Sequence, residues 1–170
     1  MKNNAKVFLI LILALVLGLG AIPAFAEPYG ASENAVELIA RFENCILTAP
    51  KDTAGVWTVG YGHTRNVTAN TVLANEAEAR ALLREDLVSY ADAVNRLAAQ
   101  SYIRFELNQN RVDALVSFAF NCGTGNLQKL VKGRTAEEVA QQILGYNRGG
   151  GKILPILTQR RQAERELFLK

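Results

Sequence analysis

The chain has 170 residues, of which 49% are hydrophobic, and a formal net charge of +3. This length suits one globular domain with a hydrophobic core, and it indicates no second domain. The small net charge identifies no class of partner, and we expect no nucleic-acid partner. With 2 cysteines, 1 histidine and no glycine-rich phosphate loop, the sequence predicts neither a metal site nor a cofactor.

The N-terminus has the pattern of a secretory signal peptide. Two lysines precede an unbroken apolar run, and the sequence AIPAFA then ends in small residues at the positions before a cut after Ala26. We therefore expect residues 1–26 to be a signal peptide and residues 27–170 to be a secreted or periplasmic catalytic domain. Residues 7–26 are also long enough to span a bilayer, so an uncleaved anchor that tethers the domain before release is the alternative.

Capping residues and the helical spacing of apolar side chains predict a mainly helical chain. Ser32, Asn75, Asn108 and Thr135 each stand where a helix would begin, and Pro155 fits the first turn of a last helix. The helices are expected over residues 32–44, 75–99, 108–123, 135–145 and 155–168. The apolar stretch from Val112 to Phe120 should form the central, most deeply buried helix.

Residues 46–64 depart from the helical pattern and are rich in glycine, threonine and aromatic residues. A turn at Thr53-Ala54-Gly55 and the run VWTVGY after it predict a small antiparallel sheet, the only segment with a convincing strand pattern. The glycines of residues 149–151 are interpreted as a flexible turn. The predicted fold class is therefore α+β, with a small antiparallel β lobe joined by a long helix to a mainly helical lobe.

Two carboxylates occupy positions that suit the hydrolysis of a glycosidic bond. Glu43 ends the first predicted helix, Asp52 lies at the entry to the sheet, and Thr58 is on the returning strand. Glycoside hydrolysis needs one carboxylic acid to protonate the leaving oxygen and one carboxylate on the other face of the sugar. The spacing Glu-x8-Asp-x5-Thr occurs by chance in many proteins, so alone it indicates this chemistry weakly.

The residues around this pattern closely resemble those of phage-type lysozymes of glycoside hydrolase family 24. The matching segments are LIARFENCILTAPKDTAGVWTVGYGHT at 38–64, ALLREDL at 81–87, ALVSFAFNCGTGNL at 114–127 and YNRGGGKILPILTQRRQAERELF at 146–168. The resemblance implies a lysozyme-like fold and an endo-acting muramidase. Such an enzyme hydrolyses the β-1,4 bond between N-acetylmuramic acid and N-acetylglucosamine in peptidoglycan and lyses bacterial cells.

The resemblance also implies roles for individual residues. Glu43 would be the general acid, while Asp52 and Thr58 would hold the attacking water, which corresponds to an inverting reaction. Phe120 and Asn121 would contact sugar at the floor of a cleft, although Phe120 could equally be core. Tyr61 and Trp57 could stack on sugar faces, but an aromatic residue in a hairpin is more often part of the core of its lobe.

Three further positions are expected to support the site. The resemblance implies that His63, the only histidine, pairs with Asp86 on the long helix rather than acting as a base. It also implies that Arg160 pairs with Glu43, with Arg161 as the alternate partner and a solvated arginine as the other interpretation.

Cys45 and Cys122 form an even pair in a chain bound for an oxidising compartment. They therefore predict one disulfide, with two free thiols as the alternative.

The expected partner is the glycan strand of peptidoglycan, and the protein is expected to be a monomer. Residues 129–170 carry 9 basic and 4 acidic side chains. This basic third is either a solvated helix face or a patch that meets the anionic cell wall.

A non-catalytic wall-binding domain with the same fold is the competing function, but it would have no use for Glu43 beside a paired Asp52 and Thr58. Membrane contact is expected only through residues 7–26, if they are not removed.

Overall fold

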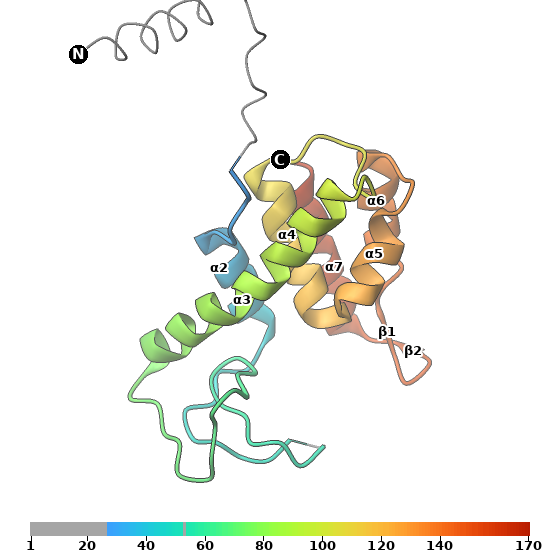
Figure 1. Ribbon diagram of the computed structural model, residues 1–170. Helices are drawn as coiled ribbons and strands as arrows, with labels where there is room; N and C mark the ends of the chain where they lie inside the picture. The colour runs from blue at the N-terminus through green and yellow to red at the C-terminus, as the bar shows by residue number, and fades with distance from the viewer. Residues whose placement is uncertain (1–26, 53) are drawn as a thin grey trace, which may run out of the picture.

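The computed structural model describes residues 27–52 and 54–170, so the predicted signal peptide or anchor lies outside the described residues. The described helices are α2 (Glu33–Phe42), α3 (Glu76–Ala99), α4 (Gln109–Cys122), α5 (Thr124–Val131), α6 (Ala136–Ile143) and α7 (Pro155–Phe168). They form a helical body, and residues 43–52 and 54–75 form a separate loop lobe beside one end of α3 (Figure 1). Within the described part of the chain, no helix has the length and apolar character needed to cross a membrane.

Four helices begin at the capping residues that the sequence predicts. The side chains of Ser32, Asn75 and Asn108 each accept a backbone N–H from the first turn of α2, α3 and α4. Thr135 forms a reciprocal capping box with Glu138 at the start of α6. These contacts satisfy N–H groups that have no partner within the helix, so the caps fix where each helix starts.

The prediction that only residues 46–64 contain strands is wrong in detail. The regular strands of the described residues are β1 (Arg148–Gly149) and β2 (Lys152–Ile153), which pair antiparallel on either side of a turn at Gly150 and Gly151. Both of these glycines have positive φ, 56° and 79°, as a tight two-residue hairpin turn requires. The loop lobe instead holds isolated antiparallel bridges, for example Ile46 with Gly60. The predicted α+β class is nevertheless confirmed.

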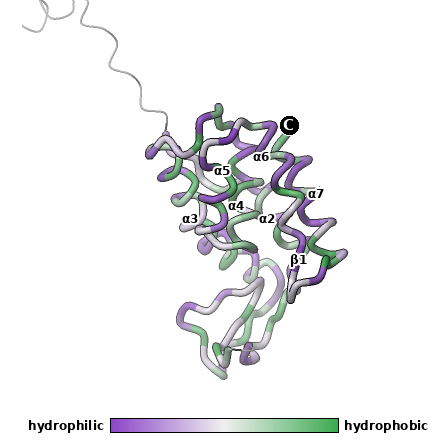
Figure 2. Tube along the Cα trace, turned by 90° about the vertical axis from the view of Figure 1, so that its right-hand side faces the viewer, coloured by the Kyte–Doolittle hydropathy of each residue, from purple (hydrophilic) through white to green (hydrophobic). Residues whose placement is uncertain are grey.

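Helix α4 is the centre of the helical body. Every residue from Val112 to Ala119 is buried, and α4 contacts α2, α3, α5 and α7. Figure 2 shows that apolar and polar residues alternate along the surrounding helices, as expected for helices that bury one face. Complete burial of a large side chain such as Phe118 contributes roughly 1.5–3 kcal/mol to folding. The exposed end of α4, at Asn121, is therefore held firmly by the buried part before it.

The start of α2 is tied to α4 through a buried carboxylate. Asp113 of α4 has an exposed fraction of 0% and accepts three hydrogen bonds. Two come from the backbone N–H and the hydroxyl of Ser32, at 2.8 and 2.5 Å, and the third comes from the Gln109 side-chain amide at 3.0 Å. The Asp113 carboxylate accepts hydrogen bonds from the residue just before α2. It therefore sets the position of that helix against the core.

Replacement of this carboxylate tests the tie. In Asp113→Ala the Ser32 N–H and hydroxyl lose their acceptor, and we expect the free energy of unfolding to fall by about 3 kcal/mol. Urea denaturation monitored by circular dichroism measures the change. Glu166→Ala, on the exposed side of α7, is the control and should change stability by less than about 0.5 kcal/mol. Equal effects of the two substitutions would contradict this role for Asp113.

Candidate active site

A cleft of about 650 Å³ lies between the loop lobe and the helical body. One wall is the loop of residues 61–65, another is the middle of α3, and the ends of α2 and α4 complete it. The lining residues are Glu43, Tyr61, Gly62, Thr64, Arg65, Glu85, Asp86, Val88, Ser89, Tyr90, Asp92, Phe120 and Asn121. The lining is therefore rich in polar and aromatic side chains.

Glu43 lies in this cleft because of the way α2 ends. Its backbone N–H still donates to the Ile39 carbonyl at 3.0 Å, but its φ of −106° and ψ of 148° are extended. The chain leaves the helix at this residue, and the carboxyl group becomes part of the cleft wall. The side chain is 29% exposed, so it is accessible to a ligand and still shielded on most sides.

Arg160 of α7 holds the Glu43 carboxyl in place. Its Nη1 donates to Glu43 Oε1 at 2.5 Å, while its own side chain is only 2% exposed. A buried guanidinium with a fixed planar geometry orients a carboxylate far better than a solvated one. Arg161, the alternate partner considered from the sequence, points elsewhere: it contacts Asn121 and Cys122 at the end of α4.

Behind Arg160 lies a buried carboxylate that the sequence analysis missed. Glu164 is 0% exposed and lies within 3.2 Å of Arg160 Nε and 2.9 Å of Arg161 Nη2, and it accepts a hydrogen bond from the Ser117 hydroxyl at 2.8 Å. Burial raises the pKa of the Glu164 carboxyl, and the guanidinium groups of Arg161 and Arg160 oppose that rise. The spacing of these charges, three and four residues apart on one predicted helix, was the signal that could have revealed the cluster.

Asp52 and Thr58 lie together on one hairpin of the loop lobe. Asp52 Oδ1 accepts the backbone N–H groups of Ala54 and Val56 at 2.9 and 2.8 Å, so this carboxylate caps the turn. The Thr58 hydroxyl donates to the Val56 carbonyl at 3.2 Å. Neither residue is among the described residues that line the 650 Å³ cleft. The structure therefore brings Asp52 and Thr58 together but does not bring them into the cleft wall with Glu43.

His63 and Asp86 are brought together at the opposite wall. His63 Nδ1 lies 2.8 Å from Asp86 Oδ2, and its Nε2 lies 3.0 Å from the Arg65 carbonyl. Both neighbours are acceptors, so the ring satisfies both contacts only when each nitrogen carries a hydrogen. Arg65 also donates to Asp86 Oδ1 at 3.1 Å. These contacts fasten the loop of residues 61–65 to α3, and the histidine is used in that attachment.

The aromatic residues divide into two groups. Phe120 lines the cleft beside Asn121, and its ring centroid lies 5.5 Å from that of Tyr90, a lining residue that the sequence analysis did not select. Tyr61 reaches the cleft but is only 5% exposed, and its hydroxyl donates to Glu76 at 2.8 Å. Burial and the Glu76 contact raise the pKa of Tyr61 to about 12. Trp57 packs against the core, with Lys51 over its ring, and is not among the described lining residues.

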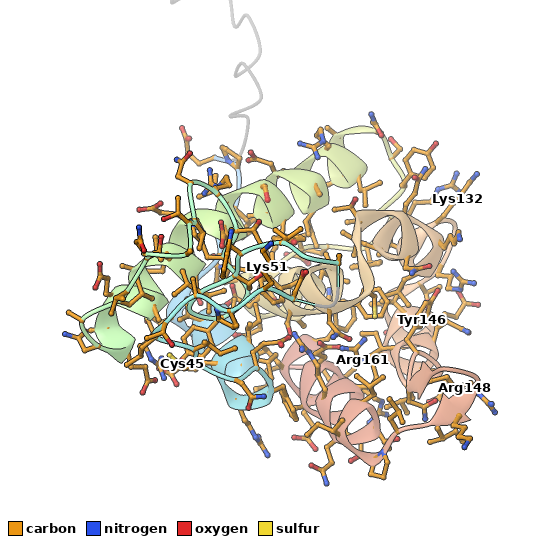
Figure 3. The ribbon with its side chains drawn as sticks, turned by 90° about the horizontal axis from the view of Figure 1, so that it is seen from below. Cys45, Lys51, Lys132, Tyr146, Arg148 and Arg161 are labelled. Carbon is orange, nitrogen blue, oxygen red and sulfur yellow. The ribbon has the colours of Figure 1, made fainter. Side chains whose placement is uncertain are left out.

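Cys45 and Cys122 are free thiols, so the predicted disulfide is not formed in the structure. Cys45 is exposed just beyond α2, and Figure 3 shows it apart from Arg161 of α7. The Cys122 sulfur instead contacts Arg161 Nη1 at 2.6 Å, which directs it toward α7. Burial raises the pKa of the Cys122 thiol although Arg161 opposes the rise, so this group is a poor nucleophile.

No group of three or more histidine, cysteine, aspartate or glutamate side chains among residues 27–52 and 54–170 is placed to hold a metal ion.

Comparison with protein families matches residues 40–164 to the phage lysozyme family. An endolysin of Lactococcus phage c2 is 38% identical over 142 residues, which are 82% of this chain and 60% of that protein. The endolysin of Acyrthosiphon pisum secondary endosymbiont phage 1 is 35% identical over 146 residues, 81% of this chain and 96% of that protein. A protein of Haemophilus phage HP1 named SAR-endolysin is 31% identical and is matched over 80% of its length.

Two solved structures have the same fold. The muramidase domain of SpmX from Asticaccaulis excentricus has a TM-score of 0.72 and 34% identity, with 84% of this chain and 99% of that chain covered. A P22 lysozyme mutant has a TM-score of 0.68 and 29% identity, with the same coverage of both chains. The chain spans only 53% of the endolysin of Bacillus phage B103 and 60% of the Lactococcus phage c2 protein. Some relatives therefore contain a further portion that these comparisons do not match.

The buried charge cluster can be tested through its central carboxylate. In Glu164→Gln the guanidinium groups of Arg160 and Arg161 lose their buried counter-charge, and we expect the free energy of unfolding to fall by about 3–5 kcal/mol. Chemical denaturation at neutral pH measures this change. Glu166→Gln makes the same chemical change on the exposed side of α7 and should be almost neutral. A loss below about 1 kcal/mol for Glu164→Gln would show that the cluster contributes little to stability.

Proposed function

Because the chain belongs to the phage lysozyme family, we propose that it is an endo-acting muramidase of bacterial peptidoglycan. It would hydrolyse the β-1,4 bond between N-acetylmuramic acid and N-acetylglucosamine without a cofactor. The observation that carries this proposal is the Glu43 carboxyl, partly exposed in the wall of a 650 Å³ cleft and held there by Arg160. A cleft of this volume has room for a few sugar rings of a glycan strand.

Glu43 would act as the general acid. Arg160 contacts Oε1 of its carboxyl group, so Oε2 is the oxygen that would carry the proton to the leaving sugar. Proton transfer requires the acid to lie within hydrogen-bond distance of the glycosidic oxygen. A carboxyl group held by an arginine keeps that position better than a mobile one. Arg160 is thus a positioning residue for the proposed acid, and Glu164 positions Arg160 in turn.

Asp52 and Thr58 would activate water on the other face of the sugar. The turn N–H groups occupy Oδ1 of Asp52, and among the described residues Oδ2 accepts no hydrogen bond, so Oδ2 would accept the proton of the water. Thr58, on the same hairpin, would orient that water through its hydroxyl oxygen. This role requires a gap between the Glu43 and Asp52 carboxyl groups that admits a water, wider than the roughly 5–5.5 Å spacing of retaining enzymes.

Phe120, Asn121 and Tyr61 would contact the bound strand. Phe120 and Asn121 lie in the cleft wall at the end of the rigid helix α4, which supports contact with a sugar face and its hydroxyl groups. Tyr61 has its hydroxyl engaged with Glu76, so only its ring is available. Export through residues 1–26, with either cleavage or membrane tethering, would place the enzyme on the wall side, and a relative named SAR-endolysin supports such a location.

The first test separates an enzyme from a wall-binding domain. Purified cell walls should clear in a turbidity assay with the wild-type protein, and Glu43→Gln should lower the rate by at least about a hundredfold because it removes the acid. Glu166→Gln, on the exposed side of α7, should clear walls at the wild-type rate. Wall binding with no clearing by the wild-type protein, or full activity in Glu43→Gln, would reject the proposal.

The second test concerns stereochemistry. If Asp52 and Thr58 hold a water, the β-linked substrate should release a product whose first-formed reducing end is the α-anomer. Proton NMR recorded within the first turnovers, before mutarotation, distinguishes the anomers. An initial β-anomer, or a trapped glycosyl ester on Asp52, would show that Asp52 is a nucleophile and that the reaction retains configuration.

A further inference from the structure

A second cavity, of about 360 Å³, lies at the other end of the helical body. It is formed by the connection between α3 and α4, the start of α4 and the turn before α6. Its lining residues are Arg104, Phe105, Arg111, Gly133, Arg134, Thr135, Ala136 and Glu137. Figure 1 shows the α3–α4 connection at the end of the molecule away from the loop lobe, where the described chain begins and where the C-terminus also lies. This cavity is therefore distinct from the proposed catalytic cleft.

The cavity carries an excess of positive charge. Three arginines and one glutamate line it, and arginine stays protonated in proteins. None of the ion pairs found among the described residues includes Arg104, Arg111 or Arg134. Most of the charge on these three guanidinium groups therefore has no counter-ion within the described protein.

Two of the arginines are already fixed in place. The Arg111 guanidinium lies over the rings of Phe105 and Phe168, at 5.8 and 5.6 Å, and Nη1 donates to the Glu106 carbonyl. Its Nε is buried and has no hydrogen-bond partner among the described residues. Arg134 donates through Nη1 to carbonyls at the end of α5. Such groups lose little side-chain freedom when an anion binds, which favours binding.

The N-terminus of α6 opens onto the same cavity. Thr135 caps this helix, and Ala136 and Glu137 of its first turn are lining residues. A helix N-terminus stabilises nearby negative charge. The exposed carboxylate of Glu137 provides such a charge in the first turn of α6. The pKa of Glu137 is lowered by its own backbone N–H, by the Thr135 hydroxyl and, less strongly, by Arg111. Local hydrogen bonds at the start of α6 thus account for most of this lowering, and Arg111 adds a smaller contribution for which an external anion would compete.

We propose that this cavity binds a phosphate-type oxyanion, either free phosphate or the phosphate of a lipid headgroup. Three arginines against one glutamate give a net charge that matches a phosphate carrying one to two negative charges, and guanidinium groups bind phosphate oxygens in pairs. The site is independent of the glycosidase activity proposed above.

The position of the cavity is compatible with a lipid headgroup as the source of the phosphate. The Tyr29 hydroxyl donates to the Leu107 carbonyl at 2.8 Å, and the Gln109 side chain donates to the Gly30 carbonyl at 2.8 Å. The first described residues are thus fastened to the segment that forms the cavity. If the apolar run of residues 7–20 is kept in a membrane, the cavity lies at the end of the domain nearest to it. The proposed catalytic cleft lies at the far end and would face the wall.

Titration of the full-length chain in neutral detergent with inorganic phosphate, at constant ionic strength, tests the site by isothermal calorimetry. We expect saturable binding that Arg104→Gln weakens about tenfold and Glu137→Gln strengthens severalfold. Lys152→Gln, which removes one exposed positive charge from β2, should leave the affinity unchanged. Glu43→Gln should bind phosphate with the wild-type affinity, because Glu43 lies outside this cavity. Phosphate binding and wall clearing are therefore measured independently, and either proposal can fail without the other. No saturable binding, or equal losses in Arg104→Gln and Lys152→Gln, would overturn the proposal.

Vesicles identify the source of the phosphate. Binding to phosphatidylcholine vesicles with and without phosphatidylglycerol is compared for the wild-type chain, Arg104→Gln and Lys152→Gln, because the apolar N-terminal run can bind either lipid. A gain from phosphatidylglycerol that is lost in Arg104→Gln alone supports the headgroup. The same gain in all three proteins, with phosphate binding still weakened in Arg104→Gln, supports a soluble phosphate and rejects the membrane source.

Discussion

The arrangement of the candidate site depends on one buried charge cluster, in which Glu164 lies between Arg160 and Arg161. These three side chains are at most 2% exposed, and removing such charges from water costs several kcal/mol for each ion. The cost is offset only when the charges and hydrogen bonds are matched, which requires α7 to keep one position against Ser117 of α4. Arg160 then has one orientation, and its outer nitrogen reaches Glu43.

Helix α2 shows why this constraint matters. It has only 10 residues, and an isolated helix of that length is barely stable in water. Its start is held by Asp113 of α4, and the residue at its end, Glu43, is held by Arg160 of α7. Tertiary contacts at both ends, together with the buried side chains of α2, therefore determine where the Glu43 carboxyl lies. The position of the proposed acid is a property of the whole helical body.

The parts of the fold that could be predicted from sequence are those governed by neighbouring residues. Helix starts at Ser32 and Thr135 follow from local capping, and the fold class follows from the pattern of helices and turns. The end of α4 at Gly123 was predicted, but α5 was not, because it begins at once after Gly123 and no capping side chain marks its start. The Gly150-Gly151 hairpin had a local signal, two glycines between short extended segments, that was interpreted only as a flexible turn.

What could not be predicted depends on which distant side chains meet. A pattern places Glu164 three and four residues from two arginines on one helix, but only packing against Ser117 of α4 shows that this cluster is buried. An even number of cysteines predicts a disulfide, but the side chain of Cys122 faces Arg161. Tyr61 has a sequence context that suits a cleft aromatic, yet its hydroxyl is used to join the loop lobe to Glu76 of α3. Each of these outcomes is decided by a contact between segments far apart in the chain.

The two sides of the proposed reaction belong to parts of the molecule held by different forces. Glu43 is fixed by the buried helical body, whereas Asp52 and Thr58 lie on a hairpin whose lobe has few buried side chains, among them Val59 and Leu73. That lobe is joined to the body through polar contacts with α3, such as His63 with Asp86, and through a few buried side chains that belong to the same hydrophobic core as the helices. A lobe with few buried side chains opens locally at a lower free-energy cost than a densely packed helical body. In the proposed mechanism, the gap that admits the attacking water is therefore set by how Asp52 and Thr58 of the loop lobe lie relative to the Glu43 carboxyl, which Arg160 holds.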